Sequence, residues 1–183
     1  MLIVVVIIGI LAAAILPRLQ GVQAAARDTA RETALRDVAM ALEMYAGATG
    51  KFPEVGNKTV AALKAKLVEE REYLKEMPLD PKKNSAFTFA DVSLSWGDLG
   101  YILIKKNGQA DQAFVLASVA ETYDKANATK AMLESTKLSS DKDFNNLKPC
   151  KTVKKVSSSP SSDWGMEECT VDSPNDLRYV VVR

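Results

Sequence analysis

Few side chains in this sequence are able to carry chemistry, and they are not arranged as an enzyme needs them. There is no histidine, which excludes Ser-His-Asp and Cys-His catalysis and a histidine-ligated zinc ion. Two cysteines, Cys150 and Cys169, are too few for a four-thiolate zinc site or an all-cysteine iron–sulfur cluster. No glycine-rich phosphate loop and no paired-carboxylate motif stands out. We therefore expect no catalytic residue, no bound cofactor and no enzymatic activity.

Three aspartates fall in one predicted loop region and could ligate calcium: Asp80, Asp91 and Asp98. Carboxylate oxygens suit this ion, but the three lack the ordered D-x-D-x-D-G spacing of a calcium loop. Aspartate is also typical of turns and caps, so we favour those roles and expect no metal site. The net charge of +1, from 24 basic and 23 acidic residues, gives no clustered basic field for a nucleic acid.

The elements that must position these residues begin with an apolar run. Residues 1–16 read MLIVVVIIGILAAAIL, and the first ionisable side chain is Arg18. As a helix this run spans about 24 Å, slightly short of the ~30 Å hydrocarbon core of a membrane. A cleaved signal peptide does not fit, because no basic region precedes the run and no cleavage motif follows it. Since every face is apolar, we predict a membrane-inserted or fully buried helix.

The same helix is predicted to continue as an amphipathic segment to about Tyr45. Good helix formers dominate residues 18–45, and no proline interrupts them. Apolar side chains recur on one face at steps of three and four, namely Leu35, Val38, Leu42 and Tyr45. We predict that a second, charged face is solvated; it comprises Arg27, Asp28, Arg31, Glu32, Arg36 and Asp37. Gly47, Gly50 and Pro53 indicate where the helix ends.

The rest of the chain indicates a mixed α+β domain. A second helix is expected over Lys58–Leu74, before two prolines that enforce extended or turn backbone. One or two helical turns are expected within 124–138. Apolar and β-branched runs predict three strands, of which the first two form a hairpin around Asn107-Gly108; the strands are Tyr101–Lys105, Ala113–Val119 and Leu177–Val182.

The apolar run resembles the first helix of type IV pilins and of the related pseudopilins of type II secretion. The resemblance rests on IVVVIIGILAAAILP, in which Gly9 and Pro17 fall where the family has its glycine and proline. ALEMYAGATGKFP resembles the end of the family's long helix, and YLKEMPLDP resembles a loop of bacterial members. Members of the family have a leader peptide and a methylated Phe-Thr-Leu-Ile-Glu start before this run. The sequence begins just after the expected glutamate, and we interpret it as incomplete there.

The resemblance implies the pilin fold, an α+β chain whose long hydrophobic-to-amphipathic N-terminal helix packs on a C-terminal antiparallel sheet. Residues 1–27 would be the membrane or filament-core half of the helix, and 28–183 a soluble globular domain. That domain would comprise an amphipathic helix at 28–48, a connecting loop region at 49–100, and the sheet with a disulfide-bounded C-terminal loop at 101–183.

The resemblance also gives the two cysteines a role. Disulfides persist in exported domains, and a disulfide-bounded C-terminal loop is common in pilins. We therefore expect Cys150 and Cys169, which are 19 positions apart, to be bonded. Closing such a loop stabilises a domain by roughly 3 kcal/mol. The alternative is two free buried thiols.

The function that the resemblance implies is that of a structural subunit of a type IV pilus. The apolar helix would form the core of an extracellular filament through Leu2, Val5, Ile8, Gly9, Leu11, Ile15 and Pro17. The expected partners are other copies of the chain, an assembly platform, an ATPase motor, a prepilin peptidase and, before assembly, the inner (cytoplasmic) membrane. Adhesion and motility are among the roles that such a filament serves.

Two other functions stay open. A major pseudopilin of a type II secretion system would share the helix, but the long C-terminal region with two cysteines favours a pilus subunit. A membrane-anchored exported sensor or binding domain would need a pocket with convergent polar groups.

Gly9 and Pro17 are weak points of the helix, because glycine adds backbone freedom and proline lacks an N–H group. We expect this segment to be helical, with a kink at Pro17, in a single chain. In an assembled filament we expect some non-helical backbone between the two residues.

Overall fold

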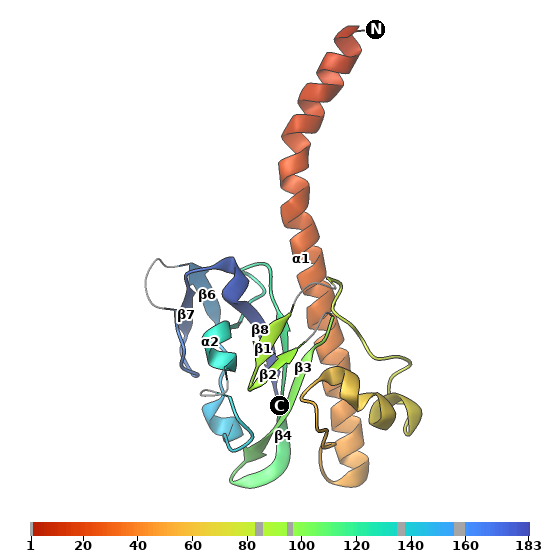
Figure 1. Cartoon of the computed structure of the whole chain (residues 1–183), viewed down its shortest axis with the longest axis vertical. Helices are drawn as coiled ribbons and strands as arrows, with labels where there is room; N and C mark the ends of the chain where they lie inside the picture. The colour runs from red at the N-terminus through yellow and green to blue at the C-terminus, as the bar shows by residue number, and fades with distance from the viewer. Residues whose placement is uncertain (1, 83–85, 95–96, 135–137, 156–159) are drawn as a thin grey trace.

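The computed structural model describes residues 2–82, 86–94, 97–134, 138–155 and 160–183, with backbone only for 14–20. Its largest element is α1 (Leu2–Thr49), which projects far beyond the domain into which its C-terminal half is packed (Figure 1). The backbone is helical throughout the segment between Gly9 and Pro17. The helix ends just before Gly50, whose φ of +82° suits glycine. In the described part of the chain, no helix has both the length and the apolar character that crossing a membrane requires.

An antiparallel sheet of four strands forms the middle of the domain, in the order β3-β4-β8-β5. These strands are β3 (Gly100–Lys106), β4 (Gln109–Val119), β8 (Leu177–Val182) and β5 (Ala128–Thr129). The predicted hairpin is confirmed, with positive φ at both Asn107 and Gly108, as a type I′ turn requires. Its second strand begins four residues earlier than we expected, because Lys106 pairs with Gln109 directly across the turn.

Two smaller sheets differ from the expected layout. β1 (Phe87–Phe89) and β2 (Val92–Leu94) form an antiparallel pair inside the region expected to be a connecting loop. β6 (Thr152–Lys155) and β7 (Glu168–Val171) pair in parallel, so the C-terminal third is not purely antiparallel. Three further short elements are α2 (Lys130–Leu133), η3 (Phe144–Asn146) and η4 (Pro174–Asp176).

The helix predicted over Lys58–Leu74 is confirmed in part, because residues 60–69 are helical but shorter and less regular than expected. A 3₁₀ turn, η1 (Val60–Leu63), continues through Lys64 into a π turn, η2 (Ala65–Glu69). Lys58 and Glu72 both have positive φ, which interrupts a right-handed helix at each end. The periodic apolar residues that suggested a helix are fully buried all the same, as anchors of the two turns: Val60, Leu63 and Leu67.

The sheet separates two apolar cores. Along β3, Tyr101 and Leu103 face one core, while Ile102 and Ile104 face the other, because alternate side chains of a strand point to opposite sides. The first core contains the inner half of α1 together with η1 and η2. The second contains β1, α2, β7 and the two cysteines. The fold is thus α+β, with a long N-terminal helix on one face of an antiparallel sheet (Figure 1).

Candidate functional site

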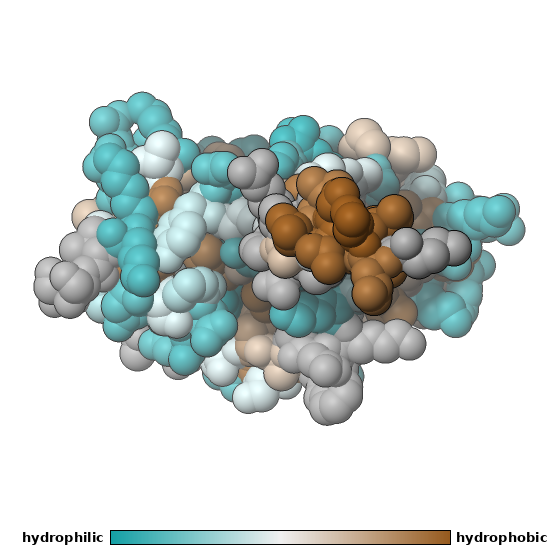
Figure 2. Space-filling model, turned by 90° about the horizontal axis from the view of Figure 1, so that it is seen from above, coloured by the Kyte–Doolittle hydropathy of each residue, from teal (hydrophilic) through white to brown (hydrophobic). Residues whose placement is uncertain are grey.

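The projecting end of α1 carries an exposed apolar surface, which we call the apolar arm (residues 2–13). Nine large apolar side chains between Leu2 and Leu11 are 53–84% exposed. Viewed along the helix, they form a compact hydrophobic cluster at the tip of the molecule (Figure 2). Of the residues predicted for a filament core, the arm exposes Leu2, Val5, Ile8 and Leu11, and a Cβ added at Gly9 would contact nothing. The side chains of Ile15 and Pro17 lie outside the described residues.

The chemistry of the apolar arm permits only one kind of interaction. It contains no charged group and no side-chain hydrogen-bond donor or acceptor. Fully burying one such side chain gives about 1.5–3 kcal/mol, so burying all nine is favourable by the order of 20 kcal/mol. Soluble monomers rarely expose contiguous apolar patches of this kind unless the patch binds something. The arm is therefore suited to contact lipid or other apolar helices.

The inner half of α1 packs on the sheet. Leu35, Val38 and Leu42 are fully buried, and Tyr45 is partly buried at the edge of the same core. Their neighbours from β3 and β4 are Tyr101, Leu103, Phe114 and Leu116. The hydroxyl of Tyr101 donates to the carbonyl oxygen of Pro53 at 2.8 Å, which fixes the chain just after α1. Burial raises the pKa of Tyr101 well above its ordinary value, so it remains a neutral donor.

Between the arm and the packed half, five charged residues form a cluster that we call the ionic neck: Arg27, Asp28, Arg31, Asp80 and Glu121. The guanidinium of Arg31 lies at its centre and is 1% exposed. Its Nε and Nη2 atoms donate to the two carboxylate oxygens of Asp80, at 2.7 and 2.9 Å. Its Nη1 atom donates to Asp28 at 2.7 Å and to Glu121 at 2.8 Å.

The other members join α1 to the turn after β4. Asp28 accepts hydrogen bonds from the backbone N–H groups of Glu121 and Thr122, at 3.0 and 2.8 Å. Arg27 holds Glu121 through Nε and Nη2, at 2.9 and 2.6 Å. Hydrogen bonds from Arg27, and then from Arg31, lower the pKa of Glu121 to about 2. The ionic neck thus fixes the point at which α1 leaves the domain.

The prediction of a solvated charged face is wrong at Asp28 and Arg31, which are 3% and 1% exposed. The sequence did contain a signal for their burial. Asp28 and Arg31 extend the stripe of Leu35, Val38 and Leu42 toward the N-terminus at the same steps of three and four. A charged pair within an otherwise apolar stripe indicates buried partners elsewhere in the chain.

The structure does not gather the three candidate calcium ligands. Asp80 belongs to the ionic neck, and Asp91 instead forms an ion pair with Lys58. Over the described ranges, no cluster of three or more aspartate, glutamate or cysteine side chains is positioned to hold a metal ion.

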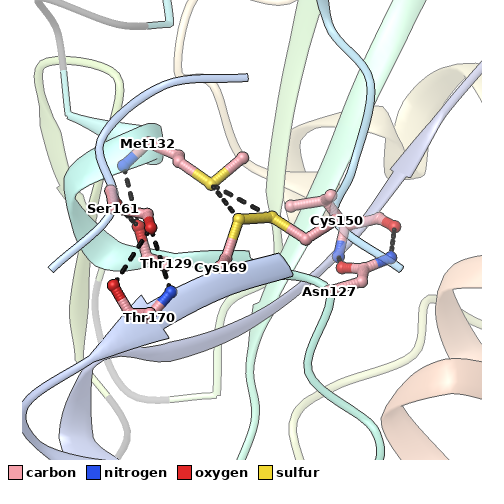
Figure 3. The surroundings of a disulfide bond; sticks show 8 residues. Asn127, Thr129, Met132, Cys150, Ser161, Cys169 and Thr170 are labelled. Carbon is pink, nitrogen blue, oxygen red and sulfur yellow. Dashed lines mark hydrogen bonds between the residues drawn. A yellow bond between two sulfur atoms is a disulfide. The ribbon is translucent and has the colours of Figure 1, made fainter. Parts of the chain in front are cut away.

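Cys150 and Cys169 lie at disulfide distance, with their Cα atoms 5.9 Å apart (Figure 3). Both are almost fully buried, and the sulfur of Met132 lies 3.8 and 3.9 Å from their two sulfur atoms. The N–H of Cys150 donates to the carbonyl oxygen of Asn127, whose side-chain amide makes two hydrogen bonds with the backbone of Val180 in β8. The cysteine pair therefore connects the C-terminal segment to the central sheet.

No protein-family model, curated protein or solved structure matches this chain. Its function must therefore be inferred from its own geometry and from the residues of its N-terminal run.

Proposed function

We propose that this chain is a structural subunit of a type IV pilus that polymerises through its apolar arm. The observation that carries the proposal is the arm itself, a helix whose nine large apolar side chains extend beyond the domain to which the helix belongs. Such a surface is stable only when lipid or other helices cover it. The resemblance of IVVVIIGILAAAILP to the pilin family supports the same assignment.

In this proposal the arms of successive copies pack side by side and form the centre of a filament. The contact is heterologous, because the arm of one copy meets different positions on the arms of its neighbours, and such contacts generate open helical polymers when they do not close into rings. Before assembly, the cytoplasmic membrane covers the arm. Transfer from lipid to a helical bundle costs little, because both environments are apolar. A separate ATPase and an assembly platform drive the extraction.

The domain supports the assignment to a pilin fold. A long helix packs on one face of an antiparallel sheet, and a pair of cysteines joins the C-terminal segment to that sheet. A major pseudopilin would have the same arm and remains the alternative within this class. An exported binding domain anchored by the arm is the alternative outside it, and it requires a cavity with unpaired polar groups.

Two matched substitutions on α1 test the proposal. Ile8 in the arm and Met40 in the inner half are both large apolar residues with similar exposure, 60% and 58%. Ile8→Glu should abolish filaments, because it places a charge in the filament core, whereas Met40→Glu should leave them intact. The measurement is negative-stain microscopy of cells that carry each variant in place of the native gene. Filaments that persist in Ile8→Glu cells, or are absent even with the native chain, would refute the proposal.

A further inference from the structure

The turn of the β3–β4 hairpin contains the sequence Asn107-Gly108, in which an asparagine can react with its own main chain. In this reaction the nitrogen of the following residue attacks the side-chain carbon Cγ of the asparagine. A following glycine hinders the attack least, because it has no side chain. Both residues are exposed, so water reaches them. No other asparagine of the sequence is followed by glycine.

The 3₁₀ turn η3 and the aspartate before it lie beside this hairpin turn and contact both residues (Figure 1). The backbone N–H of Gly108 donates to Oδ2 of Asp143 at 2.9 Å. The Nδ2 atom of Asn145 donates to Oδ1 of Asn107 at 3.1 Å and to Oδ1 of Asp143 at 2.9 Å. The two groups that would react are therefore both held by side chains from outside the hairpin.

These contacts oppose the reaction. Positive φ at Asn107 and Gly108 marks a type I′ turn, in which ψ of the first residue is about +30°. A five-membered imide ring between the two residues requires a very different ψ, so ring closure must first open the turn. Hydrogen bonds from the backbone N–H groups of Asn145 and Gly108 lower the pKa of Asp143, so its carboxylate is charged. Removing the amide proton of Gly108 beside this negative charge is unfavourable.

We propose that Asn107 is a modification site, at which asparagine converts to aspartate and isoaspartate, and that Asp143 and Asn145 suppress the reaction while η3 contacts the hairpin. The Gly108 nitrogen loses its proton to hydroxide and bonds to Cγ of Asn107. The bond between Cγ and Nδ2 breaks, and Nδ2 takes a proton and leaves as ammonia. Water then opens the imide. Attack at Cγ gives aspartate, and attack at the main-chain carbonyl carbon gives isoaspartate.

Either product should keep η3 from returning to the hairpin. Isoaspartate adds a methylene group to the main chain inside the turn, so Lys106 can no longer pair with Gln109 across it. Both products carry a carboxylate at position 107 close to that of Asp143, since one Nδ2 atom of Asn145 contacts both residues. Like charges repel at this range. The site is independent of the apolar arm and of polymerisation.

Incubation of the full chain in non-ionic detergent and mildly alkaline buffer tests the proposal. Proteolysis and mass spectrometry then measure how much of the peptide containing position 107 has been converted. Conversion should be at least about tenfold slower in the folded chain than in the same chain unfolded in urea, because a hydrogen bond to a charged group must open first. Equal rates in the folded and unfolded chain, or conversion in neither, would overturn the proposal.

Two variants and a control connect the rate to these contacts. Asp143→Ala removes the acceptor of the backbone N–H and should speed conversion in the folded chain about tenfold or more. Asn145→Ala, at an exposed position, frees the side chain of Asn107 and should speed it severalfold. Asp141→Ala, at an exposed aspartate of the same segment, should react as the native chain does. A native rate in both variants, or in Asn145→Ala if only that variant folds, would refute the proposal.

Discussion

Arg31 and Asp80 are 49 positions apart in the chain, yet they hold each other through two parallel hydrogen bonds of 2.7 and 2.9 Å. Both are buried, and Asp80 lies in the segment between the π turn η2 and β1. The pair therefore fastens a loop to the helix at the point where the helix leaves the domain. Because both side chains are buried, bulk water could not solvate either charge if its partner were removed.

Replacing Arg31 by methionine should destabilise the domain by about 3–5 kcal/mol, because two buried carboxylates lose their main partner. Arg36→Met is the matched control, since Arg36 pairs with Glu32 on the same helix but its side chain is 64% exposed. That change should cost no more than about 1 kcal/mol. Urea unfolding followed by circular dichroism measures both values. Equal losses in the two variants would mean that the ionic neck contributes little to stability.

Acid should weaken the ionic neck through Glu121. The pKa of this carboxyl group is about 2 in the folded chain, against an ordinary value of 4.5. Because the folded pKa is the lower one, the stabilisation is fully present above about pH 4.5 and is lost as the pH falls toward 2. The melting temperature should therefore fall over this interval.

The control for this pH effect is Glu121→Gln, which removes the titrating group while keeping a hydrogen-bond acceptor. This variant should be less stable than the native chain at pH 7, and the difference should shrink as the pH approaches 2. Melting curves of both proteins between pH 7 and pH 2 provide the comparison. A constant difference over the whole interval would show that the acid sensitivity originates elsewhere.

Removing the bond between the cysteines should destabilise the C-terminal segment. The bond closes a loop between residues that are 19 positions apart, which gives about 3 kcal/mol in the chain-entropy model. The double variant Cys150→Ala/Cys169→Ala should lose about this amount, measured by urea unfolding. Dithiothreitol should lower the stability of the native chain but not of the double variant. A native chain that is indifferent to reductant would contradict this prediction.

Adding one methyl group at two glycines should have opposite effects. A Cβ at Gly100 would lie 2.8 Å from ring atoms of the fully buried Phe89, so Gly100→Ala should cost about 1–3 kcal/mol. At Gly47, within α1, a Cβ would contact nothing, so Gly47→Ala should stabilise the helix by about 0.5–1 kcal/mol. Thermal unfolding of the two variants decides the question, and a loss of stability at both positions would mean that the space around Gly47 is not free.

Sequence patterns predicted those elements whose conformation is set by residues adjacent in the sequence. The hairpin follows from Asn107-Gly108, whose backbone preferences act within the turn itself. The long helix follows from good helix formers without an interrupting proline between residues 18 and 49. β1 and β2 have three residues each, which is too short for a periodic signal. The parallel pairing of β6 with β7 depends on contacts that no local pattern records.

The two candidate sites also differ in how far the sequence alone predicts them. The apolar character of the arm follows from the sequence alone, because residues 2–13 carry no polar side chain. For the ionic neck, the stripe indicates that Asp28 and Arg31 are buried, but it does not identify their partners Asp80 and Glu121, which come from distant segments.

The ionic neck has a mechanical consequence, because it is the last place at which the domain holds α1 before the helix projects. From Arg27 to Leu2 the helix extends about 37 Å at 1.5 Å per residue. A bend of only ~10° in the helix at the ionic neck would move the tip by about 6 Å, which approaches the 8–10 Å spacing between packed helices. The buried ion pairs of the neck, together with the packed inner half of α1, therefore set the direction of the projecting helix and the position of its tip. Substitutions in the ionic neck should broaden the spread of subunit orientations in any polymer, while leaving the apolar arm itself unchanged.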